Sequence, residues 1–357
     1  MVQTPNGTAS EWNNPRIAKQ QLLETLMKPI LIWLFVITPV LVACGPVEPI
    51  VINGNTMGTT YSVKIVDKVD QDALSNKIAQ RLVEINDLMS TYLPNSEISR
   101  INRLAVGAGM PISSENQAML EVARLLYQQS AGKFDITVGP LVRLWGFGPD
   151  PTTTAVPAES DIAAARAILG LEKINLERGQ IRKTHPVELD FSAIAKGYAV
   201  DELARLVSAA GANNYLVEVG GELRAAGRNQ TGTSWRIGIE RPEANTRSAL
   251  TSIPLDNMAM ATSGDYRNYF EVDGVRYSHT IDPTTGYPIT HNVVSVTVLA
   301  ETAALADGYA TAIDVMGAES GMELARRQNL PVFVILRSGS EFTTQSSAAF
   351  DEYMAAH

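Results

Sequence analysis

The 357-residue sequence contains one cysteine, four histidines and few aromatic residues, which make up 6% of the chain. A single cysteine excludes an intrachain disulfide framework and a cluster of thiolate ligands around a metal ion. Basic residues are also scarce, since 29 Lys and Arg stand against 38 Asp and Glu, giving a formal net charge of −9. Because no stripe of Lys and Arg is present to neutralise phosphates, we expect no nucleic-acid partner.

Common catalytic motifs are missing as well. The sequence has no Walker phosphate loop, GxSxG elbow, HExxH or CxxC motif. It therefore gives no support for a common hydrolase, a kinase or a zinc protease. The candidates for a histidine general base are His185, His279, His291 and His357. Chemistry must therefore be sought in less common combinations of residues.

No apolar run is long enough for a comfortable transmembrane helix, which needs about 20 residues. Residues 29–42 are uncharged and follow Lys28, a pattern typical of a secretory signal. Residues 41–44, Leu-Val-Ala-Cys, resemble a bacterial lipobox and predict lipidation of Cys44. The alternative is an uncleaved anchor helix with an incidental cysteine. Either reading places the remaining chain outside the cytoplasm.

The lipobox divides the chain into three parts. Residues 1–43 are the predicted signal peptide, with Met27 as a possible true initiator. Residues 44–50 are a lipidated tether, and residues 51–357 form the folded body. We expect a bacterial cell-envelope protein, anchored through Cys44 to a membrane leaflet and facing the periplasm.

The hydrophobic pattern of the body predicts an α+β fold. Polar and apolar residues alternate over 59–66 as in a strand, and residues 70–89 have helical periodicity. Ser114 and Gln117 resemble a capping box for a helix ending at Gly132. A helix is expected over 194–210, then strands over 215–219, 235–240, 252–255, 258–262, 268–272, 275–280 and 293–299. A helix over 302–316, another helix and a terminal strand, 331–336, complete the prediction.

This order of elements favours mixed, largely antiparallel strands with helices segregated between them, rather than a doubly wound parallel sheet. No linker or repeat divides the body. We therefore expect one continuous catalytic body built from two interleaved subdomains, and the Asp273-Gly274 pair is a hairpin signal within it.

A first polar segment precedes the helix expected over 194–210. Asp190 and Ser192 lie ahead of its start and Lys196 lies within its first turn. The free backbone N–H groups and positive dipole end of such a helix suit a phosphate or another anion. The alternative is that Asp190 or Ser192 simply caps the helix.

A second polar pair lies within a run of small apolar residues. Asp307 and Thr311 are four residues apart, so on a helix they share one face. A carboxylate and a hydroxyl are oxygen ligands suited to Mg²⁺. The alternative is a solvated aspartate in the middle of a helix.

A third segment carries His279 at a strand end, followed by an Asp-Pro turn that closes at Gly286. This position suits proton transfer at neutral pH, although a lone histidine is more often structural. Only the combination of anion site, oxygen-ligand pair and histidine favours Mg²⁺-dependent phosphoryl chemistry.

These segments also carry a family resemblance. The sequence resembles the ApbE family, the FAD:protein FMN transferases once described as thiamine-biosynthesis lipoproteins. Eight blocks carry the resemblance in order: TMGTTYSVKI (56–65), MSTYLPNSEISRIN (89–102), GKFDITVGPLVRLWGFGP (132–149), DFSAIAKGYAVD (190–201), VEVGGELRAAG (217–227), ATSGDYRNYF (261–270), SHTIDPTTGYPI (278–289) and ADGYATAI (306–313). The lipobox at Cys44 agrees with the lipoprotein form of many members.

The resemblance implies a Mg²⁺-dependent enzyme that transfers the FMN half of FAD to a threonine hydroxyl and releases AMP. The implied acceptors are subunits of membrane redox complexes that carry an S/T-G-A-T motif. Carried over by position, the implied FAD contacts are Met57, Tyr92, Lys133, Phe134, Asp135, Asp190, Lys196 and Ile281. The implied Mg²⁺ ligands are the main-chain carbonyl of Ala193 and the side chains of Asp307 and Thr311, and the implied base is His279.

One departure from the family pattern concerns the metal ligands. Ala310 stands where some members have an acidic or hydroxyl residue, and its side chain cannot bind a metal. Two other functions stay open at this point: a Mg²⁺-dependent FAD pyrophosphatase, in which water replaces the threonine, and a non-catalytic flavin-binding lipoprotein of the envelope.

Overall fold

The computed structural model describes residues 48–148, 155–242, 248–264 and 269–357. The predicted signal peptide and Cys44 lie outside the described residues, so the processing and lipidation of this segment stay predictions. The fold below belongs to the compact unit of residues 47–357. None of its described helices combines the length and apolar character that crossing a membrane requires.

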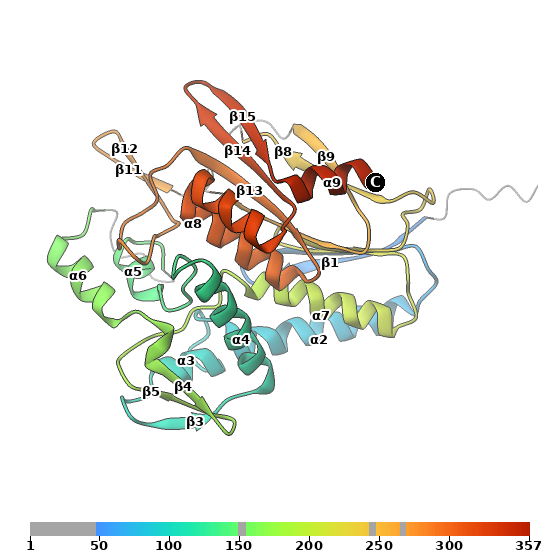
Figure 1. Cartoon of the computed structure of the whole chain (residues 1–357). Coiled ribbons are helices and arrows are strands. Elements are labelled where there is room, and N and C mark those ends of the chain that lie inside the picture. Colours follow the sequence, from blue (N-terminus) through green and yellow to red (C-terminus); the bar gives the residue numbers. More distant parts are fainter. Residues whose placement is uncertain (1–47, 149–154, 243–247, 265–268) are drawn as a thin grey trace, which may run out of the picture. The chain divides into compact units, whose positions relative to one another are not determined.

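An eight-stranded sheet forms the centre of this unit (Figure 1). In spatial order its strands are β1 (Ile50–Thr56), β2 (Thr59–Ile65), β6 (Tyr215–Val219), β7 (Glu222–Ala226), β10 (Ala259–Gly264), β13 (Val293–Ala300), β14 (Val332–Ser338) and β15 (Glu341–Ser346). All neighbouring pairs are antiparallel. β13 is buried at every position, because layers of structure cover both faces of the sheet there.

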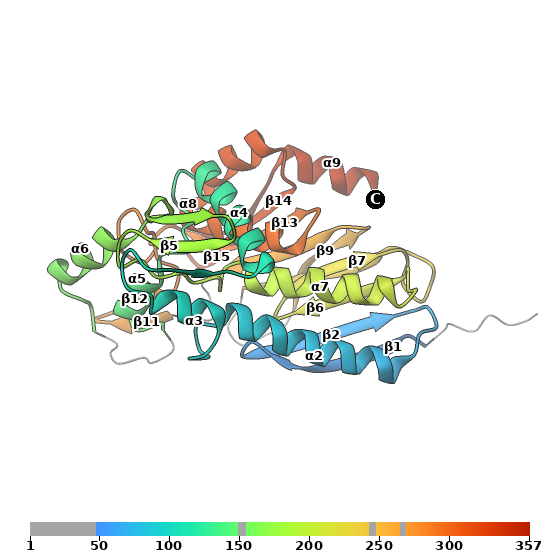
Figure 2. The ribbon, with the colours of Figure 1, turned by 90° about the horizontal axis from the view of Figure 1, so that it is seen from below.

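Three helices cover one face of the sheet: α2 (Gln71–Met89), α7 (Ala195–Ala209) and α8 (Ala303–Gln328) (Figures 1 and 2). Their apolar faces hold them there; α2 buries Leu74, Ile78, Leu82, Ile85 and Met89, as its periodicity predicted. The hairpin of β8 (Trp235–Glu240) and β9 (Ala249–Leu255), together with α9 (Ala348–Ala356), covers a second apolar cluster on the opposite face.

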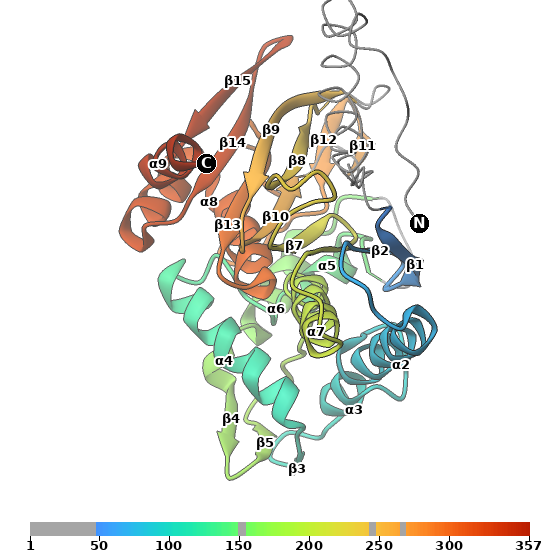
Figure 3. The same cartoon turned by 90° about the vertical axis from the view of Figure 1, so that its right-hand side faces the viewer.

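The chain leaves the sheet after β2 and rejoins it at β6, and most of the intervening residues form a separate lobe (Figure 3). The lobe consists of α3 (Glu97–Asn102), β3 (Gly109–Pro111), α4 (Ser114–Gln129), α5 (Gly139–Leu144), α6 (Glu159–Ile168), a 3₁₀ turn η1 (Leu171–Lys173), β4 (Ile174–Glu177) and β5 (Gln180–Lys183). Strands β3, β5 and β4 form a small antiparallel sheet. The predicted α+β class is confirmed, and the antiparallel preference holds for every described strand pair.

A third small unit is the hairpin of β11 (Tyr269–Val272) and β12 (Val275–Ser278). Asp273 and Gly274 form its turn, both with positive φ, as the hairpin signal predicted. β12 ends at Ser278 rather than at residue 280, so His279 lies just beyond the strand.

Several boundaries differ from the sequence-based expectations. The fold opens with the β1–β2 hairpin rather than with one strand, and β15 and α9 follow the strand expected to be terminal. The cap of α4 is Ser113, whose hydroxyl accepts the Asn116 N–H, and not Ser114. α4 ends at Gln129, before Gly132. The two helices expected from residue 302 onward are the two parts of α8, which is interrupted at Gly317 (φ 75°).

Candidate active site

The site is built around the close approach of α7 and α8. A side chain at Gly197 would overlap the main-chain carbonyl of Ala303, so only glycine allows this separation. The approach brings Asp307 of α8 to the first turn of α7, where its Oδ2 accepts the Gly197 N–H at 3.1 Å. Asp307 is 3% exposed. The alternative of a solvated mid-helix aspartate is therefore wrong.

Lys196 connects Asp307 to a residue that the sequence did not single out. Its Nζ donates to Oε1 of Glu222 at 2.9 Å and lies 3.7 Å from Oδ2 of Asp307. Glu222 is the first residue of β7 and is 3% exposed. Its second carboxylate oxygen, Oε2, has no hydrogen-bond partner among the described residues.

The electrostatics of this triad follow from its burial. Burial raises the pKa of Glu222, Lys196 opposes the rise and Asp307 adds to it, so the pKa reaches about 8. Burial also raises the pKa of Asp307, again opposed by Lys196. For Lys196 burial acts downward, but the two carboxyls outweigh it and hold its pKa above the usual value. One ammonium charge is thus shared between two buried acids.

One face of α8 continues the site beyond Asp307. Thr311 lies one turn further along, with its Oγ1 3.3 Å from Oγ of Ser263 on β10. Another turn along, Asp314 accepts a hydrogen bond from Thr280 Oγ1 at 3.3 Å. The predicted pair of Asp307 and Thr311 therefore shares one face, as expected, and that face also reaches the segment of His279.

His279 follows β12, and its ring makes a T-shaped contact with that of Phe147, at 6.3 Å between ring centroids. After it, Ile281 pairs with Pro288 in an isolated bridge. The predicted turn is present: Asp282 accepts the Gly286 N–H at 2.7 Å, and Gly286 has the positive φ that favours glycine. A rigid turn thus carries His279 and Ile281 at the site.

Lys133 fastens this turn to the lobe. Its Nζ donates to Oδ2 of Asp282 at 2.6 Å and to Oγ1 of Thr284 at 2.7 Å. Burial acts to raise the pKa of Asp282, but the hydrogen bonds from Lys133 and Thr284 outweigh it, so the pKa lies below its usual value. Asp135 differs, because burial raises its pKa despite hydrogen bonds from Thr137.

The segment before α7 forms a turn rather than a cap. Oδ1 of Asp190 accepts both the backbone N–H and the hydroxyl of Ser192. α7 begins at Ala195, and its N-cap residue, Ile194, makes no side-chain cap. Capping of α7 by Asp190 or Ser192 is therefore wrong. In the first turn of α7, the Gly197 N–H donates to the carboxylate of Asp307. This N–H group therefore binds a negatively charged side chain of the protein itself.

These residues meet in one cavity of about 450 Å³. Of the predicted site residues it is lined by Tyr92, Lys133, Phe134, Asp135, Asp190, Ala193, Lys196, His279, Ile281, Asp307 and Thr311. Met57 instead lines a neighbouring cavity of about 750 Å³, which shares Tyr92, Ser192 and Lys196 with the first. Segments far apart in the sequence thus converge, while the roles of the individual residues stay predictions.

Comparison with known proteins now identifies the family. The model of the ApbE family matches residues 57–336. The chain belongs to the ApbE family.

Relatives in this family are similar over nearly their whole length. The FAD:protein FMN transferase of Vibrio cholerae is 42% identical over 330 residues, which cover 90% of this chain and 99% of the relative. That of Haemophilus influenzae is 42% identical over 322 residues, covering 87% and 93%.

Solved ApbE structures share the fold. The flavin transferase ApbE from Vibrio cholerae matches with a TM-score of 0.81 at 42% identity, covering 86% of this chain and 99% of that one. The apo form of the Pseudomonas stutzeri flavinyl transferase ApbE also gives 0.81, at 40% identity, covering 87% and 98%.

The ApbE cavity offers oxygen donors rather than a cluster of acids. No group of three or more His, Cys, Asp or Glu that could hold a metal lies within the described residues. Asp307, Thr311 and Ala193 nevertheless line the same cavity, and a set made of a carboxylate, a hydroxyl and a main-chain carbonyl would suit Mg²⁺. Ala310 is fully buried, and its methyl side chain offers no ligand atom.

Sequence reasoning missed Glu222, Ser263 and Asp314, which line the same ApbE cavity. Asp314 could have been found, because it lies seven residues after Asp307 and therefore on the same helical face. Glu222 had a weaker signal in the Gly-Gly pair before it, which requires a tight turn. Ser263 carried no signal by itself.

Proposed function

We propose that this protein transfers the FMN moiety of FAD to a threonine hydroxyl of an acceptor flavoprotein. In the reaction a bond forms between the threonine oxygen and the FMN phosphorus. The bond from that phosphorus to the bridging pyrophosphate oxygen breaks, and AMP departs with its electron pair. The observation that carries the proposal is one cavity that joins His279, Lys196 and the Asp307–Thr311 pair, in a chain whose relatives are named FAD:protein FMN transferase.

In this proposal each residue of the cavity has a role that follows from the chemistry of its side chain. His279 accepts the proton of the threonine hydroxyl as general base. Lys196, protonated at neutral pH, places a positive charge beside the pyrophosphate. Asp307, Thr311 and the carbonyl of Ala193 would hold Mg²⁺. Bound there, the ion would neutralise negative charge on the phosphate oxygens.

FAD recognition uses both cavities in this proposal. Lys133, Phe134, Asp135, Asp190 and Ile281 line the first cavity, and Met57 lines the second. Tyr92 and Lys196 border both. An elongated dinucleotide suits two neighbouring cavities that share lining residues.

The location of the enzyme is a proposal from sequence alone. Cys44 would be lipidated and anchor the domain to the bacterial envelope on its periplasmic side, close to acceptor subunits of membrane redox complexes. When cells are grown with labelled palmitate, the unaltered chain should carry the label and Cys44→Ser should not, because the fatty acyl chains are attached through lipidation of Cys44. An unaltered chain without the label would mean that the apolar segment is an uncleaved anchor instead.

One assay tests the reaction. The full chain in detergent is incubated with FAD, Mg²⁺ and an acceptor domain that carries an S/T-G-A-T motif, with a matched acceptor whose motif threonine is replaced by valine. We expect covalent flavin fluorescence only on the threonine acceptor after denaturing electrophoresis, together with AMP. Free FMN and AMP with an unlabelled acceptor would identify an FAD pyrophosphatase, and intact bound FAD would identify a binding protein.

A further inference from the structure

The ammonium of Lys196 lies between two buried carboxyl groups at unequal distances. It is 2.9 Å from Oε1 of Glu222 and 3.7 Å from Oδ2 of Asp307. The shorter contact is a hydrogen bond with good geometry, whereas the longer one is chiefly electrostatic. Glu222 is therefore the residue that fixes where this ammonium lies.

The main chain holds Glu222 in that position. Gly220 and Gly221, both with positive φ, turn the chain between β6 and β7 directly before it. A side chain at Gly220 would lie 3.1 Å from Cδ of Lys196 and 2.8 Å from Cγ2 of Thr59, so the turn packs closely against the lysine stem. Both the head and the stem of Lys196 are thus held by the start of β7.

Burying Glu222 has a cost that its packing does not explain. Its Oε2 is buried with no partner among the described residues, and an unsatisfied buried polar atom destabilises the folded state. An apolar side chain of similar length would avoid that cost. A function in the cavity, through Lys196, accounts for a carboxyl group at this position.

The geometry shows what that function is. Without Glu222, Asp307 is the one remaining carboxyl group beside Lys196 among the described ion pairs. The tethered ammonium would then close on Asp307 and compete with any metal ion for its oxygens. Glu222 prevents this closure whether or not it is charged, because a protonated carboxyl keeps an acceptor oxygen.

We propose that Glu222 is a positioning residue that holds the Lys196 ammonium apart from Asp307, which leaves Asp307 accessible to a divalent cation. This inference rests on the proposed function, in which Asp307 binds Mg²⁺ and Lys196 stays beside the phosphates. It assigns to Glu222 a role that neither binds the ion nor touches the reacting atoms.

The test measures cation binding directly. Mn²⁺ is titrated into the FAD-free protein and unbound Mn²⁺ is followed by electron paramagnetic resonance, while flavin transfer gives the Mg²⁺ concentration for half-maximal rate. Glu222→Met replaces the carboxyl group by an apolar side chain of similar volume. It should raise both the Kd for Mn²⁺ and the half-maximal Mg²⁺ concentration about tenfold or more, as expected for loss of a hydrogen bond to a charged group. Glu222→Gln keeps an acceptor and should raise them less.

Two further variants isolate the effect. Glu121→Ala removes an exposed carboxylate of α4 that lines neither cavity and should leave cation binding unchanged. In a Lys196→Met background no ammonium competes for Asp307, so adding Glu222→Met should cause no further loss of Mn²⁺ affinity. If Glu222→Met does not fold, Glu222→Ala replaces it.

The outcomes separate the inference from the proposed function. If the unaltered protein binds Mn²⁺ and Glu222→Met binds it equally well, the inference is wrong while the metal site stands. A tenfold loss that persists in the Lys196→Met background would also overturn it, because Glu222 would then act on the cation itself. If the unaltered protein shows neither Mn²⁺ binding nor Mg²⁺ dependence, the metal site fails, and the inference fails with it.

Discussion

At the scale of single residues, His279 carries the clearest prediction. It follows β12 directly and lines the same cavity as Lys196 and Asp307. Replacing it by asparagine removes the base but keeps a polar side chain of similar size. His279→Asn should slow flavin transfer by about 10²–10⁴-fold while FAD binding, followed by quenching of flavin fluorescence, stays largely intact.

A matched control for this prediction is His185→Asn. His185 is exposed, contacts Thr184 and lies outside both cavities, so its replacement should leave transfer unchanged. Unchanged turnover of His279→Asn would exclude His279 as the base. A loss of FAD binding in that variant would instead show that the imidazole holds the substrate.

The predicted pair of metal-ligating side chains lies within one element, whereas the missed residue Glu222 has its partner in a different element. Asp307 and Thr311 share a face because of their spacing on one helix, which a sequence shows directly. Glu222 and Lys196 are 26 positions apart, separated by most of α7 and by β6. Nothing local to either residue reveals that pairing. The burial that raises the pKa values of Glu222 and Asp307 likewise depends on tertiary packing.

At the scale of elements, the crossing of α7 and α8 sets the geometry of the site. A methyl group at Gly197 would overlap the main-chain carbonyl of Ala303, and the main chain can yield only if the helices separate. Gly197→Ala should therefore lower the free energy of unfolding by about 3 kcal/mol, at the upper end for overpacking. It should also slow flavin transfer, because separating the helices would break the Gly197 N–H hydrogen bond that orients the Asp307 carboxylate.

Gly308→Ala is the matched control on the facing helix. A methyl group there would meet the Cδ1 atom of Leu126, the end of a flexible side chain. Repacking of that side chain should limit the cost to about 1 kcal/mol. Urea denaturation of both variants measures the difference. Equal losses of stability would show that the α7–α8 distance adjusts as readily as a leucine side chain.

Elements with strong periodicity were predicted well, and short ones were not. α2 buries five apolar residues at helical spacing, so its extent follows from the sequence. Strands β3, β4 and β5 have three or four residues each, too few for an alternating pattern to stand out. β15 was missed because none of its positions is fully buried, so its sequence shows no alternating apolar pattern. Its place at the sheet edge depends on pairing with β14.

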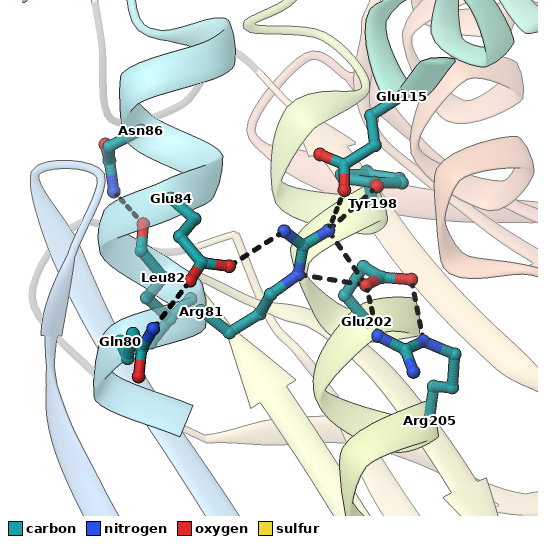
Figure 4. A network of polar contacts seen from close by, with 9 residues as sticks. All are labelled: Gln80, Arg81, Leu82, Glu84, Asn86, Glu115, Tyr198, Glu202 and Arg205. Carbon is teal, nitrogen blue, oxygen red and sulfur yellow. Dashed lines mark hydrogen bonds and ion pairs between the residues drawn. The ribbon is translucent and has the colours of Figure 1, made fainter. Parts of the chain in front are cut away.

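At the scale of the whole unit, Arg81 connects the helices on the sheet to the inserted lobe (Figure 4). Its guanidinium donates to Glu202 of α7 at 2.9 Å, to Glu115 of α4 at 2.7 Å and to Glu84 of its own helix at 3.2 Å. It also bonds the hydroxyl of Tyr198 at 3.1 Å, and burial with the nearby carboxylates raises the pKa of that tyrosine to about 12. Three helices from two parts of the fold thus share one cation.

Removing this cation should destabilise the whole unit. The Arg81 side chain is only 11% exposed, and its loss leaves Glu115 without its counter-charge, whereas Glu202 keeps its ion pair with Arg205 at 2.9 Å. Arg81→Met should lower the free energy of unfolding by about 3 kcal/mol, the scale for breaking a buried ion pair from one side. Arg81→Lys should recover only part of that loss, because an ammonium group cannot serve several acceptors in the fixed planar arrangement of a guanidinium.

Chemical denaturation followed by far-UV circular dichroism measures these changes, and Arg326→Met is the matched control. Arg326 pairs with Glu323 on the surface of α8, where its side chain is 74% exposed. Because water and salt screen such a pair, its removal should leave the unfolding midpoint unchanged. If Arg81→Met also keeps the native midpoint, the lobe is held to α2 and α7 by apolar packing alone, and the shared guanidinium adds no stability to the fold.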